Sequence, residues 1–321
     1  MKRRVIYPAR RRTGTYRSRA KETLVYMRKH WMFYAMLALP ILYYVLFHYK
    51  AMPGVVIAFK NYNIFKGIWE SPWVGMKYFQ QVAKSKAFWL SVRNMLVLNI
   101  MGLVLGFPLP IILALFLNEI NHRLFKKTIQ TVIYLPHFIS WSVVGGMMYQ
   151  VFASSGLVNT IIKGFGGSPI GFLSNKGWWI FTYFMVGVWK SIGWNTIIYL
   201  SAMTSIDQEI YEAARVDGCS RFRMMVSITV PCIKDTIAIM LILAVGNIMN
   251  VGYEKVLLMQ NDLNLNYSEI VSTYTYKIGL ASGITDFSLS TAIGMFNSII
   301  NFTLLIIANT LSKKLSGSGI F

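Results

Sequence analysis

Six long apolar stretches recur along the chain, and the polar segments between them are rich in glycine and proline. They cover about residues 31–48, 94–117, 129–152, 178–203, 235–259 and 287–311. Each is close to the roughly 20 residues that a helix needs to cross the hydrocarbon core of a bilayer. Composition agrees, because 55% of the residues are hydrophobic and only 14% are charged. The sequence therefore predicts an all-α membrane protein with six transmembrane helices over residues 31–311.

The basic residues indicate how these spans are oriented. The net charge is +20, and residues 1–30 carry eleven Lys and Arg but one acid, Glu22. The segments outside the spans alternate between the two sides of the membrane, and those on one side hold about twenty Lys and Arg in total, against about ten on the other. The side with more Lys and Arg is expected to face the cytoplasm. Both termini, residues 1–30 and 312–321, are therefore predicted to be cytoplasmic tails. Nucleic-acid binding is disfavoured because no aromatic residues are interleaved with a basic patch.

Three inter-span segments are predicted to lie outside, and one of them is the glycine-rich loop at 153–177. Residues 49–91 are broken by glycine and proline, and they carry tryptophans suited to a membrane interface. A segment of this length favours a small structured flap that receives an external partner, with a plain connector as the alternative. Residues 260–287 are predicted to be polar and external.

No pattern in the sequence indicates an enzyme. The spans hold no nucleophile–base set, no paired carboxylates and no metal-ligand cluster. Cys219 and Cys232 are too few for a disulfide framework, and their spacing matches no metal or redox motif. We therefore expect a transport protein with no catalytic residues and no bound metal.

The polar segment at 204–234 has the pattern of two capped helices. Asp207 or Ser205 can cap a helix over residues 208–216, and Gly218 occupies the position where helices end in a left-handed residue. Ser220 can cap a second helix, which Pro231 is predicted to stop before the fifth span. A short capped helix is stiff enough to transmit force, so we predict a mechanical joint on the cytoplasmic face.

This segment resembles the EAA loop of ABC-importer permeases. The resemblance rests on Glu212-Ala213-Ala214, then Asp217-Gly218, with Pro231 thirteen residues after the glycine. Segments Phe59-Lys60, 67–75 and 134–141 are similar to a subgroup of the maltose-type permeases. Ile206, Cys219 and Val230 differ from residues common in the family.

The resemblance implies the type I importer fold and a set of partners. These are a second homologous permease forming a heterodimer, two ATP-binding subunits and an external solute-binding protein. The joint would be the coupling helix that docks on the ATPase. The subgroup imports oligosaccharides from polysaccharide breakdown, including acidic pectin- or xylan-type fragments. Since the chain has no Gly-x-x-x-x-Gly-Lys-Ser/Thr motif, ATP and Mg are expected on the partner ATPase, with no cofactor in this chain.

Polar and aromatic residues within the spans are the candidates for a sugar pathway. Polar groups are costly in a membrane and should face protein or a lumen, and sugars bind through ring stacking and a few hydrogen bonds. The candidates are Trp189, Lys190, Trp194, Asn247, Asn250, Tyr253, Glu254, Asn297 and Asn301. Hydrogen bonding between helices explains the asparagines equally well. Lys190 could bind an acidic sugar or pair with Glu254.

Two rival functions fit the composition. A permease of the same class for another solute differs only in its substrate. An ion-coupled secondary transporter would need titratable relays or symmetric broken-helix sites, and neither is evident in the sequence.

Overall fold

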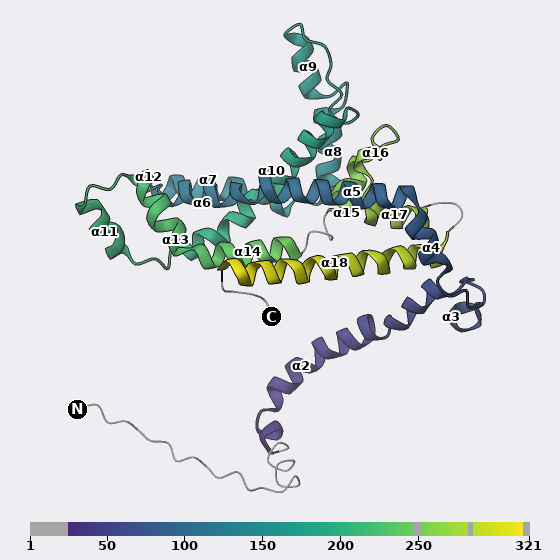
Figure 1. The fold of residues 1–321 in the computed structure, drawn as a ribbon. Helices are drawn as coiled ribbons and strands as arrows, with labels where there is room; N and C mark the ends of the chain where they lie inside the picture. Colours follow the sequence, from purple (N-terminus) through teal and green to yellow (C-terminus); the bar gives the residue numbers. More distant parts are fainter. Residues whose placement is uncertain (1–24, 247–251, 282–284, 317–321) are drawn as a thin grey trace. The chain divides into compact units, whose positions relative to one another are not determined.

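The structure is a computed structural model that describes residues 25–246, 252–281 and 285–316 (Figure 1). The chain divides into two compact units, residues 1–56 and 57–321. Most of the predicted N-terminal tail, at 1–24, and the C-terminal residues 317–321 lie outside the described residues. The two units are described separately below.

The first unit contains one apolar helix. α2 spans Trp31–Tyr44 and continues as a π-helical turn, η1, over Val45–Tyr49. None of the residues of α2 is buried, although Pro40 lies inside it. A helix that is apolar on all sides suits contact with lipid or with another membrane helix. The 3-10 segment η2, Met52–Phe59, runs across the boundary into the second unit.

In the described residues of the second unit, the regular secondary structure is helical, apart from one isolated β-bridge between Lys60 and Trp73. Its first half consists of α3 (Gly67–Glu70), α4 (Lys77–Lys84), α5 (Lys86–Met101), η3 (Gly102–Gly106), α6 (Pro108–Asn118), α7 (Arg123–Tyr134), η4 (Leu135–Phe138), α8 (Trp141–Phe152), α9 (Leu157–Gly164) and α10 (Lys176–Met203). Its second half consists of α11 (Gln208–Val216), α12 (Arg221–Met224), η5 (Met225–Thr229), α13 (Val230–Cys232), α14 (Lys234–Gly246), α15 (Tyr253–Met259), α16 (Leu265–Ser268), α17 (Val271–Tyr276), η6 (Lys277–Ala281) and α18 (Phe287–Ser316).

Two apolar cores hold this unit together around α10. Trp179 of α10, Phe88 of α5, Val256 of α15 and Ile293 of α18 belong to the larger one, and each is almost completely buried. The smaller core lies nearer the C-terminal end of α10 and contains Tyr199, Leu117 and Ile233. α14 and α18 lie side by side, as Figure 1 shows. α10 is therefore the element against which the other long helices are positioned.

The third predicted span is not one straight helix. The stretches Arg123–Phe138 and Trp141–Gly164 meet at an angle of 101°. Pro136 ends the first stretch because its ring disfavours a continuing helix. Ser140 begins the second by accepting a hydrogen bond from the backbone N–H of Val143 at 3.3 Å. The predicted span at 129–152 therefore contains a sharp bend next to its proline.

Pro231 does not stop the second helix of the 204–234 segment, contrary to the prediction. It lies at the start of α13, and the helical stretch Arg221–Cys232 ends one residue later, before a 66° bend into Lys234–Val245. The π turn η5 comes just before this proline, as η3 comes just before Pro108. Proline donates no backbone N–H, so a widened turn accommodates it inside the helix.

By length and composition, three helical stretches among the described residues could cross a membrane, or up to five if each bent pair is one span. The three straight ones are Trp31–Phe59, Lys86–Asn118 and Phe287–Ile307. α10 is not among them, although it is a continuous helix of 28 residues. These helices fit a multi-pass, all-helical membrane protein. The six transmembrane helices predicted from the sequence are more than the three to five stretches counted here.

Candidate functional site

The predicted joint is an exposed helix, α11, with caps at both ends. Asp207 begins it by accepting a hydrogen bond from the backbone N–H of Glu209 at 3.0 Å. Ser220 in turn caps α12 by accepting from the backbone N–H of Arg223 at 3.4 Å. Both sequence-based assignments are confirmed, with Asp207 rather than Ser205 as the first cap. In Figure 1, α11 lies at the same end of the second unit as α12 and α13.

Gly218 ends α11 in the left-handed conformation that the sequence predicted. Its φ is +74°, a value that side chains with a Cβ adopt only at a cost. The backbone N–H of Gly218 donates to the carbonyl of Arg215, and that of Cys219 donates to Ala214. These two bonds form a Schellman motif, which satisfies the last carbonyls of the helix. The end of α11 is thus fixed by backbone geometry.

One face of α11 is held and the other is open. The Tyr211 hydroxyl lies 2.8 Å from the hydroxyl of Thr229 in η5, which ties α11 to the following helix. Glu212 and Ala213 are exposed, and Val216 is 88% exposed. Among the described residues the only ion pair joins Lys277 and Glu269, so the carboxylate of Glu212 has no ion-pair partner there. An anchored helix with an exposed acidic and apolar face is suited to docking on another protein.

The predicted flap is a structured segment. The ammonium of Lys60 donates to the carbonyls of Ile68 and Trp69 at 2.8 and 2.9 Å. The hydroxyl of Ser288 donates to the carbonyl of Lys60 at 2.7 Å and fastens the segment to α18. Phe65 and Trp69 nevertheless remain 94% and 76% exposed. A rigid segment that displays large aromatic side chains has the form of a contact surface.

The three candidates on α10 do not converge on one pocket. Trp189 lines an apolar pocket of about 240 Å³ between α8 and α10, together with Met148 and Val186. Trp194 stacks on the ring of His137, with ring centroids 4.4 Å apart. Both tryptophans therefore have a packing role in this structure.

Lys190 caps the break between η4 and α8. Its ammonium donates to the carbonyls of Pro136, His137 and Ile139 at 3.4, 2.8 and 2.5 Å. Its side chain is buried, whereas Glu254 is exposed and forms no ion pair with it. The hypothesis of a Lys190–Glu254 pair is therefore wrong for this structure, and Lys190 satisfies the carbonyls that the bend leaves free.

Lys190→Met is expected to destabilise the protein, because it leaves these three carbonyls without their charged donor. A hydrogen bond to a charged group contributes about 2 kcal/mol, and the loss should be at least that large. Thermal unfolding of the purified assembly measures it. Lys176→Met, at the exposed start of the same helix, is the control and should have the same melting temperature as the wild type. If Lys190→Met and Lys176→Met have the same melting temperature, the capping role of Lys190 is contradicted.

The remaining candidates lie on α15 and α18 or outside the described residues. Tyr253 contacts the ring of Tyr276 edge to face, with centroids 5.6 Å apart. Asn297 and Asn301 lie one turn apart on α18, and the amide oxygen of each is buried without a hydrogen-bond donor. Asn247 and Asn250 fall at 247–251, outside the described residues. The two amide oxygens of α18 are free to accept a bond from a partner or a substrate.

A second buried lysine, Lys255, was not among the residues expected from the sequence. It lies in α15 and is 8% exposed, with its ammonium 3.3 Å from the ring centroid of Tyr183 and 5.9 Å from that of Trp141. The sequence nevertheless indicated this residue, because Lys255 lies within the predicted fifth span just as Lys190 lies within the fourth.

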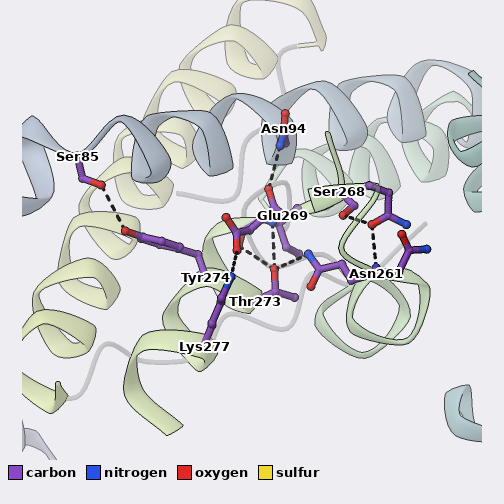
Figure 2. A network of polar contacts seen from close by, with 11 residues as sticks. Ser85, Asn94, Asn261, Ser268, Glu269, Thr273, Tyr274 and Lys277 are labelled. Atoms are coloured by element: carbon purple, nitrogen blue, oxygen red, sulfur yellow. Dashed lines mark hydrogen bonds and ion pairs between the residues drawn. The ribbon is translucent and has the colours of Figure 1, made fainter. Parts of the chain in front are cut away.

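The segment predicted to be polar and external contains regular structure. Its residues 260–281 include α16, α17 and η6, and a polar network joins them to α5 (Figure 2). The amide of Asn94 donates to the carbonyls of Asn266 and Glu269 at 3.1 Å each. Burial raises the pKa of the Glu269 carboxyl, and the ammonium of Lys277 at 3.8 Å opposes this rise. The network holds a buried helical segment between α15 and α18.

These features can be compared with known proteins. Residues 106–317 match the family model described as the binding-protein-dependent transport system inner membrane component. The chain belongs to this family. As an inner membrane component, it is a transport permease subunit and not an enzyme.

Two curated relatives resemble this inner membrane component over nearly its whole length. Protein LplB of Bacillus subtilis (strain 168) is 42% identical over 295 residues, which are 92% of each chain. The polygalacturonan/rhamnogalacturonan transport system permease protein YteP of the same organism is 42% identical over 306 residues, or 95% of each chain.

A solved structure agrees in fold. It is a bacterial ABC transporter involved in the import of the acidic polysaccharide alginate, with 34% identity and a TM-score of 0.84. The similarity covers 92% of this chain and 99% of the compared one. A second structure shows the alginate transporter in complex with an alginate pentasaccharide-bound periplasmic protein, at 34% identity and a TM-score of 0.82. The type I importer permease fold implied by the EAA-like motif is thereby confirmed.

Proposed function

We propose that this protein is the permease subunit of an ATP-driven importer of oligosaccharides, including acidic ones of the pectin or alginate type. The observation that carries the proposal is the capped, exposed helix α11 in a chain of this family. Its relatives include a permease for polygalacturonan and rhamnogalacturonan and a structure of an alginate importer. Their shared chemistry is an oligosaccharide that carries carboxylates.

Coupling to ATP hydrolysis takes place at α11. The exposed residues Glu212 and Ala213 dock on a partner ATP-binding subunit, which carries ATP and Mg. Asp217 and Gly218 fix the end of the helix, and the carbonyl of Ala214 accepts a hydrogen bond from the backbone N–H of Cys219. Pro231 lies where the helical stretch from Arg221 bends into α14, so that movement of α11 passes through η5 into a membrane helix. The caps at the ends of α11 keep the helix rigid, so that it can transmit this movement.

The chain crosses the membrane six times, with both termini in the cytoplasm. α10 completes the count, because its 28 residues are long enough to span. The Lys and Arg residues support this orientation, being about twice as frequent in the segments assigned to the inside. α11 then faces the ATPase, and the flap at residues 60–85 faces outward.

The outward flap receives the solute-binding protein. Its exposed Phe65 and Trp69 provide the kind of aromatic anchors found at the centres of protein interfaces. The similar alginate transporter, solved in complex with a periplasmic protein, supports this role. A second homologous permease completes the membrane pathway, to which this chain contributes Asn247, Asn250, Tyr253, Glu254, Asn297 and Asn301.

Uptake into proteoliposomes tests this function. The complete complex should import a uronate oligosaccharide only with ATP inside and the loaded binding protein outside. Uptake that persists without ATP but collapses with the ion gradients would indicate a secondary transporter instead. A panel of amino acids, peptides and neutral sugars tests the alternative substrates, and import of one of these in place of oligosaccharides would overturn the substrate assignment.

A further inference from the structure

Two lysine ammonium groups converge on one aromatic ring inside the second unit. Lys190 of α10 lies 5.3 Å from the ring centroid of Trp141, and Lys255 of α15 lies 5.9 Å from it. Lys255 also lies over the ring of Tyr183, at 3.3 Å from its centroid. Both side chains are at least nine-tenths buried. Two lysine side chains are thus held close together in the interior of a membrane protein.

The two lysines are compensated very differently. Lys190 donates to three backbone carbonyls. Within the described part of the chain, the Lys255 ammonium forms no hydrogen bond or ion pair, and it lies over the faces of Tyr183 and Trp141. No Asp or Glu of the described residues forms an ion pair with either one. When protonated, Lys255 is therefore a cation without a counter-charge among the described residues.

This arrangement is unfavourable unless an anion binds. Burying an ammonium costs several kcal/mol even after relaxation, whereas a desolvated contact with an aromatic face returns about 2 kcal/mol. Ionisable residues within membrane helices are expensive and usually mark a functional pathway. A carboxylate beside Lys255 would remove the deficit and gain a charge-assisted hydrogen bond.

We propose that Lys255 binds a carboxylate of the transported oligosaccharide and gives the pathway its preference for acidic sugars. This assignment rests on the proposed function. A sugar acid fits the site better than a simple anion does, because the partly exposed ring of Trp141 lies beside the ammonium, and aromatic rings are the side chains on which sugars stack. Lys190 does not share this role, since its ammonium is occupied by the bend at η4.

The test compares uptake of trigalacturonate with uptake of the same trisaccharide after reduction of its carboxyl groups. The solute-binding protein is held at saturation, and it affects every permease variant equally. The wild-type complex should import the acidic form faster. Lys255→Met should lower the ratio of acidic to reduced uptake by about tenfold, the effect of losing one favourable contact of ~1.4 kcal/mol. Lys255→Arg should retain most of the ratio.

Gly187 provides a second, independent variant. A Cβ at this position of α10 would overlap the Lys255 ammonium, which is the flexible end of a side chain and can move aside. Gly187→Ala should therefore displace the charge and lower the ratio without unfolding the helix. In the Lys255→Met background, the same change should have no further effect on the ratio. An equal effect in both backgrounds would contradict the proposal.

Each failure has a distinct meaning. Import of neither trisaccharide by the wild type would refute the proposed function itself. An unchanged ratio in Lys255→Met would overturn only the role of Lys255. If both Lys255→Met and Lys255→Gln fail to assemble with the second permease, the lysine is a structural counter-ion for that subunit, and the proposal is wrong.

Discussion

Replacing Gly218 by valine is expected to lower ATP-driven uptake by about tenfold or more while membrane insertion stays normal. The residue has a φ of +74° and ends α11 through the Schellman motif. A β-branched side chain at this φ costs roughly 1–2 kcal/mol or more, so the end of α11 should unwind or turn. The position is otherwise open, because no atom lies within 4 Å of the point that a Cβ would occupy. The defect should therefore stay local.

Uptake and substrate-stimulated ATPase activity of the reconstituted complex measure this effect. Gly218→Asn is the matched control, because asparagine tolerates the left-handed conformation and should retain most activity. Insertion is checked by the yield of the variant in the membrane fraction. Full uptake by the valine variant would show that the geometry at the end of α11 does not matter for coupling.

Gly193→Ala is expected to be among the most damaging substitutions outside the joint. A Cβ at Gly193 of α10 would overlap the backbone carbonyl of Ile133 in α7 and press on the ring of Tyr134. Backbone atoms cannot move aside as a side-chain end can, so the two helices would have to separate. Overpacking of this kind costs about 1–3 kcal/mol, and it would also disturb the nearby carbonyls that Lys190 caps.

The yield and melting temperature of the assembled complex test this expectation. Gly146→Ala, in α8, is the control, since a Cβ there would meet no atom within 4 Å. That change should be neutral or stabilising by about 0.5–1 kcal/mol, the difference in helix propensity between the two residues. If both variants melt with the wild type, the close α7–α10 crossing is not needed for stability.

The 204–234 segment could be predicted in detail because its structure is local. A cap depends on a side chain and an N–H two or three residues away, and a helix end on one glycine. Asp207, Ser220 and Gly218 all follow these rules. Pro231 did not follow the expected rule that a proline ends a helix, because a proline can follow a π turn within a continuing helix. Whether a helix stops or widens before a proline depends on packing that the sequence does not display.

The bend in the third span depended on a distant residue. Pro136 and Ser140 mark the positions where helices end and begin, but the bend also needs Lys190 on another helix to satisfy the free carbonyls. The structure of residues 260–281 also depends on distant partners, since the Asn94 side chain of α5 donates to the backbone of Asn266, and the Asn264 side chain donates to the carbonyl of Leu173 before α10. Polarity alone does not distinguish a buried, fully bonded segment from a solvated loop.

The pathway residues show the same limit. A lysine within a predicted span indicates a polar environment, but Lys190 and Lys255 differ only in which partners surround them. That difference arises from the crossing of α8, α10 and α15, which no short pattern encodes. Fold and family were therefore accessible from sequence, whereas the division of roles between the two lysines required the structure.

Site-specific photo-crosslinking tests the central claim most directly, namely that α11 is the surface on which the ATPase docks. A benzoylphenylalanine at Val216, which is 88% exposed on α11, is expected to form an adduct with the ATP-binding subunit of the purified complex. The same group at Phe65, which is 94% exposed on the flap, should form none with that subunit. Absence of an ATPase adduct from Val216, or an equal adduct from Phe65, would contradict the account.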